Sequence, residues 1–260
     1  MLQDFLQTNV FLFMLLFLRV GTAIIVMPGI GDGFVPNRIR LFFALGFTLV
    51  ILPPLTPLLP AKMPGPGLFL TLLVTEGLIG YFIGMIGRIL AMALDTAGML
   101  ISIQSGLSNA QLFNPSLQSQ GSIIGVFLVL SGILMMFVTN MHHMLLAGVF
   151  NSYQSFPVGA ILDTEGMLQT ILQVIAMSFE IGFHIAAPFL LVITVIYIGM
   201  GVLNKVMPQM QVFMIALPLQ ILLSLIMLAG VMGAGLMYWI GHLQDGADIY
   251  YQVGIEGRAR

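Results

Sequence analysis

Five charged side chains interrupt the long apolar runs of this sequence, and they are the first candidates for chemistry. They are Arg19, Glu76, Arg88, Asp95 and Glu180. A charge at the centre of a bilayer costs a few kcal/mol unless a partner or water meets it, so we expect partners for each. Arg88 and Asp95 are too far apart along a helix for an ideal direct pair, whereas Glu180 and His184 have the spacing for a hydrogen bond. Two interpretations follow: structural ion pairs or a proton relay.

Signatures of catalysis and of metal binding are scarce. The sequence contains no HExxH, GxSxG or GxxxxGK[ST] motif. The adjacent His142 and His143 would point about 100° apart on a helix, which is poor geometry for holding one metal ion. The absence of cysteine excludes disulfides, thiolate metal sites and a cysteine nucleophile. A Ser105–His184 dyad stays open as the basis of an intramembrane enzyme, but we expect no catalysis, no cofactor and no metal.

Small residues recur along one stretch of the chain at helical spacing. They are Gly77, Gly80, Gly84 and Gly87, continued by Ala91 and Gly98. Intervals of three and four residues place them on one face of a helix. Missing side chains let a second helix backbone come close, and this is how helices associate in membranes. The pattern predicts a packing face for another helix of this chain or of another subunit.

The stretch from Ser102 to Ser122 is polar but carries no charge. It holds four glutamines, two asparagines and six serines, with a turn signal at Asn114-Pro115. Irregular backbone is not tolerated in contact with lipid, but it is allowed where it is buried in protein or lines a water-filled cavity. The stretch is therefore either a solvated connecting loop or a segment that lines or plugs a pore.

The composition indicates what kind of elements carry these residues. The 260 residues are 59% hydrophobic and 7% charged, against roughly 25% charged in soluble domains. No Asp, Glu, Lys or Arg occurs from Thr96 to Leu162 or from Val206 to Gln244. Lipid or other apolar subunits must cover such stretches. We expect an all-α integral membrane protein, and the net charge of −2 argues against a nucleic-acid surface.

Proline and glycine clusters divide the chain into about six apolar segments. We expect these at Phe11–Met27, Leu41–Leu52, Leu68–Ile101, Ile123–Phe150, Met167–Met200 and Val212–Leu243. A helix needs about 20 residues to cross a bilayer core, so the second segment is too short unless it continues through its prolines. The third and fifth would each be about 51 Å long, more than tilt absorbs. Some helices are expected to be broken, re-entrant or extended beyond the membrane.

Two stretches follow the motif order of one known family. The first is Leu18-Arg19-Val20-Gly21, followed by Met27-Pro28-Gly29-Ile30-Gly31 and Val35-Pro36-Asn37-Arg38-Ile39-Arg40. The second runs from Glu76-Gly77-Leu78-Ile79-Gly80 through Ala97-Gly98-Met99-Leu100-Ile101 and Gln104-Ser105-Gly106 to Phe113-Asn114-Pro115. In motif order, length and segment count the chain resembles the FliR/SpaR-type subunits of type III secretion export gates, flagellar FliR above all. The family pattern has an acidic residue where this chain has Asn114, so no charge-based role is carried over to that position.

The resemblance implies a function and a set of partners. The function is that of a core subunit of the export gate, which forms and closes the channel for unfolded flagellar or secreted proteins. The partners are FliP-like and FliQ-like subunits in one hetero-oligomeric complex, FlhB-like and FlhA-like export components, unfolded substrates and membrane lipid, with no nucleic acid. The place is the bacterial inner membrane, within the flagellar or type III basal body.

The resemblance also implies an internal division and a plug. Residues 1–179 would be a FliP-like part and 180–243 a FliQ-like helix hairpin that turns near Asn204-Lys205, within one membrane domain over 1–253. Residues 254–260 resemble a protease-cleavage linker and are set aside. The loop matching Gly106–Gln120 would plug the closed pore. The plug residues would be Gly106, Leu107, Asn109, Leu112, Phe113, Asn114, Pro115 and Leu117.

An alternative class stays open beside the export gate. A secondary transporter or small channel would use intramembrane charges as coupling groups. The candidates for that role are Glu76, Arg88, Asp95 and Glu180. Solute transport by the purified chain alone would favour this class, and co-purification with a ring of small helical membrane proteins would favour the gate.

Overall fold

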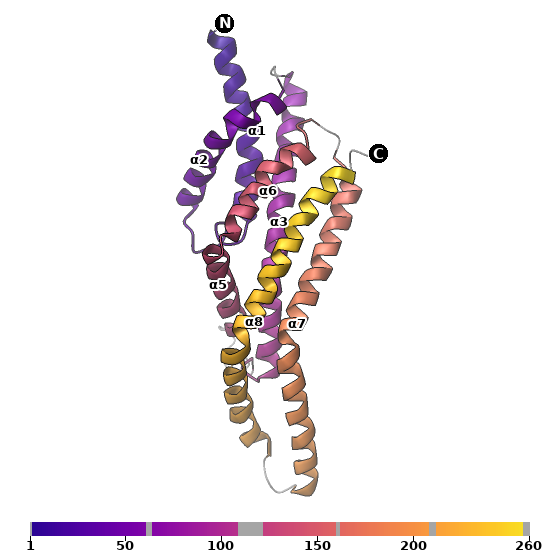
Figure 1. Cartoon of the computed structure of the whole chain (residues 1–260). Coiled ribbons are helices and arrows are strands. Elements are labelled where there is room, and N and C mark those ends of the chain that lie inside the picture. Colours follow the sequence, from indigo (N-terminus) through magenta and orange to yellow (C-terminus); the bar gives the residue numbers. More distant parts are fainter. Residues whose placement is uncertain (1, 61–63, 109–121, 160–161, 208–211, 257–260) are drawn as a thin grey trace. The chain divides into compact units, whose positions relative to one another are not determined.

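Helices make up the computed structural model, which describes residues 2–60, 64–108, 122–159, 162–207 and 212–256. In apolar surroundings a helix satisfies its backbone N–H and C=O groups internally, and the described residues form no strand. The expected all-α class is confirmed (Figure 1). The elements are α1 (Leu2–Val26), α2 (Asn37–Leu55), the 3-10 turn η1 (Thr56–Leu58), α3 (Pro66–Gln104), α5 (Ile123–Val138), α6 (Met141–Ser155), α7 (Thr164–Val206) and α8 (Val212–Glu256).

Local signals account for where these helices begin and end. Helix α1 ends before Pro28, and Gly29 takes the positive φ of 84° that the following turn needs. Helix α3 starts on Pro66, which tolerates the first helical position because its missing N–H would be unpaired there anyway. Gly106, with φ 77°, follows the end of α3 in the left-handed conformation common after helix C-termini. Asp163 accepts a 3.0 Å hydrogen bond from the Gly166 N–H and so caps the start of α7.

One expectation about the segments needs correction. The fourth apolar segment is not one helix, because Asn140 adopts a left-handed φ of 59° and separates α5 from α6. Asn204 and Lys205, near which the hairpin was expected to turn, lie in the last turn of α7. The second segment does continue through its prolines, as Pro53 and Pro54 lie within α2.

Membrane-spanning length is present in five helices of the described chain. They are α1, α2 with η1, α3, α7 and α8, and the count rises to six if the broken pair of α5 and α6 forms one span. The apolar windows of α1 and α3 are 50% and 44% buried within the chain, whereas those of α7 and α8 are only 22% and 11% buried. Within the chain, α1 and α3 therefore bury about half of their apolar windows, whereas α7 and α8 leave most of theirs exposed.

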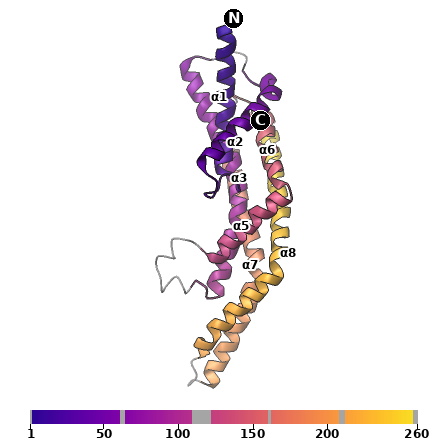
Figure 2. The ribbon, with the colours of Figure 1, turned by 90° about the vertical axis from the view of Figure 1, so that its left-hand side faces the viewer.

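Contacts divide the chain into two compact units that interleave along the sequence. Unit 1 comprises residues 1–89, 137–174 and 243–260, and unit 2 comprises 90–136 and 175–242. In unit 1, α1 lies beside the first half of α3 in both views of the ribbon, and α2 turns back along α1 (Figures 1 and 2). The division at residue 180 that the family resemblance implies stays a prediction.

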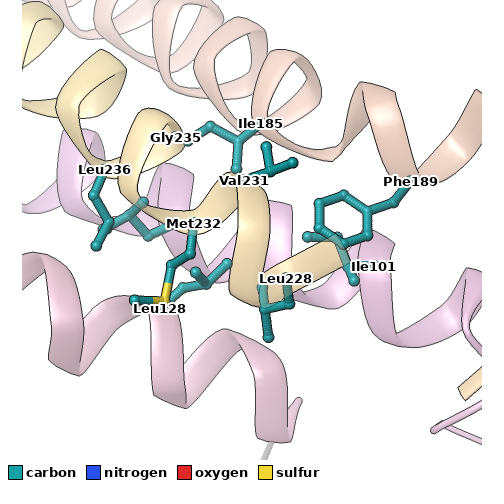
Figure 3. A pocket seen from close by; sticks show the side chains of 10 residues that line it. Ile101, Leu128, Ile185, Phe189, Leu228, Val231, Met232, Gly235 and Leu236 are labelled. Atoms are coloured by element: carbon teal, nitrogen blue, oxygen red, sulfur yellow. The ribbon is translucent and has the colours of Figure 1, made fainter. Parts of the chain in front are cut away.

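The core of unit 2 is formed where α3, α5, α7 and α8 meet. Ile101, Leu128, Phe189 and Leu228 converge there from the four helices (Figure 3). The space left between them is about 10 Å³, room for at most about one water molecule. The Trp239 indole N–H donates a 2.8 Å hydrogen bond to the Leu90 carbonyl and fastens α8 to α3. Unit 2 therefore has a packed apolar core at this point and not a ligand pocket.

Candidate functional site

A buried ion pair joins α1 to α3 in unit 1. The Arg19 guanidinium donates from Nε to Glu76 Oε2 at 2.7 Å and from Nη2 to Glu76 Oε1 at 2.8 Å. Both side chains are 0% exposed. Two parallel hydrogen bonds between a guanidinium and a carboxylate fix orientation as well as adding energy, because both groups are planar forks. Two of the five charges expected to need partners thus satisfy each other.

Helix α6 completes the surroundings of Arg19. Its Nη2 also donates to the Phe156 carbonyl at 2.9 Å, and Nη1 donates to the Ser152 hydroxyl at 3.3 Å. The guanidinium carbon lies 4.0 Å from the centre of the Tyr153 ring, a cation–π contact. Arg19 therefore holds three helices of unit 1 together: α1 through its own backbone, α3 through Glu76, and α6 through Ser152, Tyr153 and the Phe156 carbonyl just after its end.

The glycines of α3 bring its backbone against α1 beside this ion pair. A methyl group placed on Gly80 would overlap the Arg19 carbonyl oxygen and the Thr22 hydroxyl. One placed on Gly84 would lie 2.6 Å from the Ala23 carbonyl oxygen, closer than real side chains come. On Gly77 the nearest atom would be Leu18 Cδ2, at an ordinary 3.5 Å. The close approach of α1 and α3 therefore depends on Gly80 and Gly84.

The remaining glycines of the stripe meet other elements. Gly87 faces Pro28 and Leu145 within unit 1, with 3.3 Å from a built methyl group to the proline Cδ. In unit 2, Gly98 of α3 lies directly against the backbone of Gly125 in α5. The small residues of α3 thus contact more than one helix. Gly80 and Gly84 lie against α1, and Gly98 lies against α5.

Arg88 has a partner that the sequence spacing did not indicate. It forms an ion pair with Asp32, in the turn between α1 and α2, and not with Asp95. The second oxygen of Asp32 accepts the Gly29 N–H at 2.7 Å. The Arg40 guanidinium donates to the Val35 and Gly31 carbonyls of the same turn. Two arginines from α3 and α2 therefore hold the turn that follows α1.

The other two acidic candidates, both in unit 2, lie in different surroundings. Asp95 is exposed on α3 beside Gly125, and Glu180 is exposed on α7. His184 contacts the Tyr238 hydroxyl of α8 at 3.2 Å, and within the described chain it makes no hydrogen bond to Glu180. The Ser105 hydroxyl donates to the Ser102 carbonyl. Neither a Glu180–His184 relay nor a Ser105–His184 dyad is assembled among these residues.

The base of the polar segment after α3 is fastened within unit 2. The hydroxyls of Ser102 and Ser122 lie 2.6 Å apart, and Ser122 Oγ donates to the Gly98 carbonyl at 3.0 Å. The Gly125 N–H donates to Ser122 Oγ, also at 3.0 Å. Gly106 and Leu107 are described just beyond α3. The other expected plug residues lie outside the described residues: Asn109, Leu112, Phe113, Asn114, Pro115 and Leu117.

Several residues of the site were not found by sequence reasoning. Ser152, Tyr153 and Phe156 give no local sign that they face Arg19, because they lie more than a hundred residues away. Ser122 was treated as one more polar residue of a loop, although it receives and donates hydrogen bonds at the base of that loop. Asp32 had a weak signal, since an acid in the polar turn after an apolar segment can pair with a charge in a span.

No cluster of three or more metal-binding side chains occurs among the described residues. With long apolar helices, glycine-mediated contacts and a buried ion pair, the chain is a multi-span α-helical membrane protein. It belongs to the family described as "Bacterial export proteins, family 1", whose sequence model matches residues 10–246.

Individual proteins that are similar to this chain support the family assignment. The flagellar biosynthetic protein FliR of Caulobacter vibrioides is 34% identical over 93% of this chain and 96% of its own length. The FliR of Aquifex aeolicus is 31% identical over 83% of each chain. The Yop proteins translocation protein T of Yersinia pestis is 29% identical over 56% of each chain. The similarity to the Caulobacter vibrioides FliR thus spans nearly all of both chains.

Removing either partner of the buried ion pair should destabilise the protein strongly. Glu76→Gln leaves the Arg19 charge without its counter-ion in a dry site, and we expect a loss of about 3–5 kcal/mol in the free energy of unfolding. Arg88→Gln, at a partly exposed pair, should cost about 1 kcal/mol or less. Reversible unfolding in mixed micelles measures both. A double Arg19→Met, Glu76→Gln variant should lose less than the sum of its single changes; strict additivity would contradict direct coupling.

The glycine face makes a position-specific prediction. Gly80→Ala should destabilise the protein by about 1–3 kcal/mol, because the new methyl group must push α1 away from α3. Gly77→Ala is the matched control on the same helix and should change stability by less than about 0.5 kcal/mol, since its methyl group meets only an ordinary contact. Equal losses from the two variants, in the same unfolding measurement, would show that the close contact at Gly80 does not set the cost.

Proposed function

We propose that this chain is a component of a type III protein export apparatus, and a core subunit of its gate. The family match over residues 10–246 supports the export role, and so do the relatives named flagellar biosynthetic protein FliR and Yop proteins translocation protein T. In this proposal the chain assembles with FliP-like and FliQ-like subunits, beside FlhB-like and FlhA-like components, in the bacterial inner membrane. Unfolded flagellar or secreted proteins are the substrates.

The exposed faces of α7 and α8 support a place in a larger assembly. These helices have 43 and 45 residues, about 64 and 68 Å at 1.5 Å per residue. The hydrocarbon core of a bilayer is only about 30 Å thick. Large apolar side chains such as Leu191, Val195 and Ile226 are more than half exposed along them. Apolar surface that extends past the lipid needs cover, and other apolar subunits can supply it.

The fastened base between Ser102 and Ser122 is the observation that supports a closing role for the segment between them. Hydrogen bonds of Ser122 with Ser102 and with the Gly98 carbonyl hold the two ends of the segment side by side in unit 2. Neutral amides and hydroxyls with a few apolar side chains can fill a lumen and exclude ions without holding a charged substrate tightly. In this proposal Leu112, Phe113 and Asn114 occupy the closed pore.

A secondary transporter is supported less well. Two of its four candidate coupling groups are engaged in ion pairs, Glu76 with Arg19 and Arg88 with Asp32. A coupling carboxylate must exchange a proton or an ion, and the bidentate pair of Glu76 holds it in one state. Solute uptake by vesicles that contain the purified chain alone would restore this alternative.

The export role predicts that this chain can replace the FliR of a similar bacterium. Expressed in a Caulobacter vibrioides strain that lacks its own FliR, this chain should restore flagellar assembly and swimming, because relatives this similar over their full length share partner surfaces. Motility in soft agar and flagellin in the medium measure the result, with membrane levels of the chain checked by immunoblot. A membrane-inserted chain that co-purifies with the host FliP and FliQ yet restores no secretion would contradict the proposal.

The closing role predicts a leak. Deletion of residues 110–119 should raise the small-ion conductance of the co-expressed, closed complex by about tenfold or more, since the barrier to ions is removed. Ser122→Ala should raise it less, because only the base is loosened. Thr194→Val, which removes an exposed hydroxyl on α7 that donates to the Leu190 carbonyl of the same helix, is the control. Planar-bilayer recording measures all three, and wild-type conductance in the deletion variant would overturn the plug.

A further inference from the structure

A cavity of about 320 Å³ lies between α1 and α2 in unit 1. One face of each helix forms its walls. The lining residues are Phe17, Gly21 and Ile25 of α1 and Asn37, Arg40, Leu41 and Ala44 of α2. Phe17 to Ile25 covers about 12 Å along the helix axis at 1.5 Å per residue. The lining residues therefore place the cavity as a groove that follows α1 over this length. In the ribbon of Figure 1, α2 turns back along α1.

The two ends of the groove differ in chemistry. Near Phe17 and Ala44 the walls are apolar. At the end where the chain turns from α1 into α2, the polar lining residues are Asn37 and Arg40, and no acidic residue lines the groove. Three N–H groups of Arg40 donate to the Gly31 and Val35 carbonyls, which fixes the guanidinium without neutralising it. A guanidinium has five N–H donors, so two remain for a ligand.

The charge around this polar end is positive and uncompensated among the described residues. Arg38 is exposed in the same first turn of α2, and that turn contains no acid. Asp32, in the preceding turn, is already paired with Arg88 and with the Gly29 N–H. Two arginines at a helix N-terminus also oppose the usual preference, because that end of a helix is itself positive. The end of the groove therefore favours an anion.

We propose that this groove binds an anionic phospholipid, with one acyl chain along Phe17, Gly21 and Leu41 and the phosphate at Arg40 and Asn37. Helices α1 and α2 both have the length and hydropathy of membrane spans, and Arg40 lies near the end of one, where headgroups are found. The volume falls in the usual range of about 300–1,000 Å³ for ligand sites. A zwitterionic lipid fits less well, because no carboxylate among the lining residues can pair with its ammonium group.

The probes are phosphatidylglycerol, phosphatidylcholine and inorganic phosphate. Native mass spectrometry of the full chain, or of its co-expressed complex, measures the lipid retained from mixed micelles. We expect phosphatidylglycerol to be retained over phosphatidylcholine and not to be displaced by inorganic phosphate. Arg38→Gln should weaken retention about fivefold, the effect of one basic residue near an anionic headgroup. Lys205→Gln, which removes an exposed cation outside the groove, should leave retention unchanged.

A second variant separates the lipid site from the fold of the turn, since Arg40 also holds the 31–35 backbone. Gly21→Leu fills the groove without removing a charge, and a methyl group on Gly21 meets nothing closer than Phe17 at 3.9 Å. It should abolish selective retention while the thermal stability of the lipid-free chain is kept. Equal retention of both lipids, displacement by inorganic phosphate, or wild-type retention by Gly21→Leu would each overturn the proposal. Because none of these readouts involves secretion, the proposed export role stands or falls separately.

Discussion

A charged group inside an apolar helical protein must find its counter-ion within the protein, and Arg19 with Glu76 meets this requirement in unit 1. The pair is fully buried, bidentate and supported by Ser152, Tyr153 and Phe156. Replacing such a pair by apolar residues can leave stability unchanged, whereas leaving one charge alone is costly, so the pair specifies which helices meet more than it adds stability. The packing of α1, α3 and α6 follows from that requirement.

The close contact of α1 with α3 follows from the same site. The Arg19 backbone carbonyl lies against Gly80, so the ion pair and the glycine face together set the distance between α1 and α3. Where no hydrophobic effect drives helices together, backbone approach gives the dispersion contacts that replace it. Helix α3 uses the same device in unit 2, where Gly98 meets Gly125 and the Ser102–Ser122 hydrogen bond lies beside them. Small residues thus place both the ion pair and the base of the polar loop.

The exposed parts of the chain explain why a subunit role suits it. Satisfied charges and close contacts concentrate on α1 and α3, while α7 and α8 remain apolar and open over most of their length. A self-contained transporter would bury its coupling charges around a shared path, but Asp95 and Glu180 are exposed, and Glu76 and Arg88 are held in ion pairs. The chain's membership in the bacterial export family is consistent with the proposal that partner subunits cover this surface.

Composition and periodicity in the sequence determined the membrane class, the helical fold and the approximate segments, because burying a backbone in lipid leaves few alternatives to helix. They also singled out Arg19, Glu76 and the α3 glycines, since unusual residues in apolar runs are visible without a structure. Pairing was decided only in three dimensions. From the spacing along one helix, only Asp95 was considered as a partner for Arg88. The actual partner, Asp32, lies in the turn between α1 and α2. The contacts of α6 with Arg19 likewise depend on tertiary packing, because neighbours distant in sequence bring the partners of a buried arginine together.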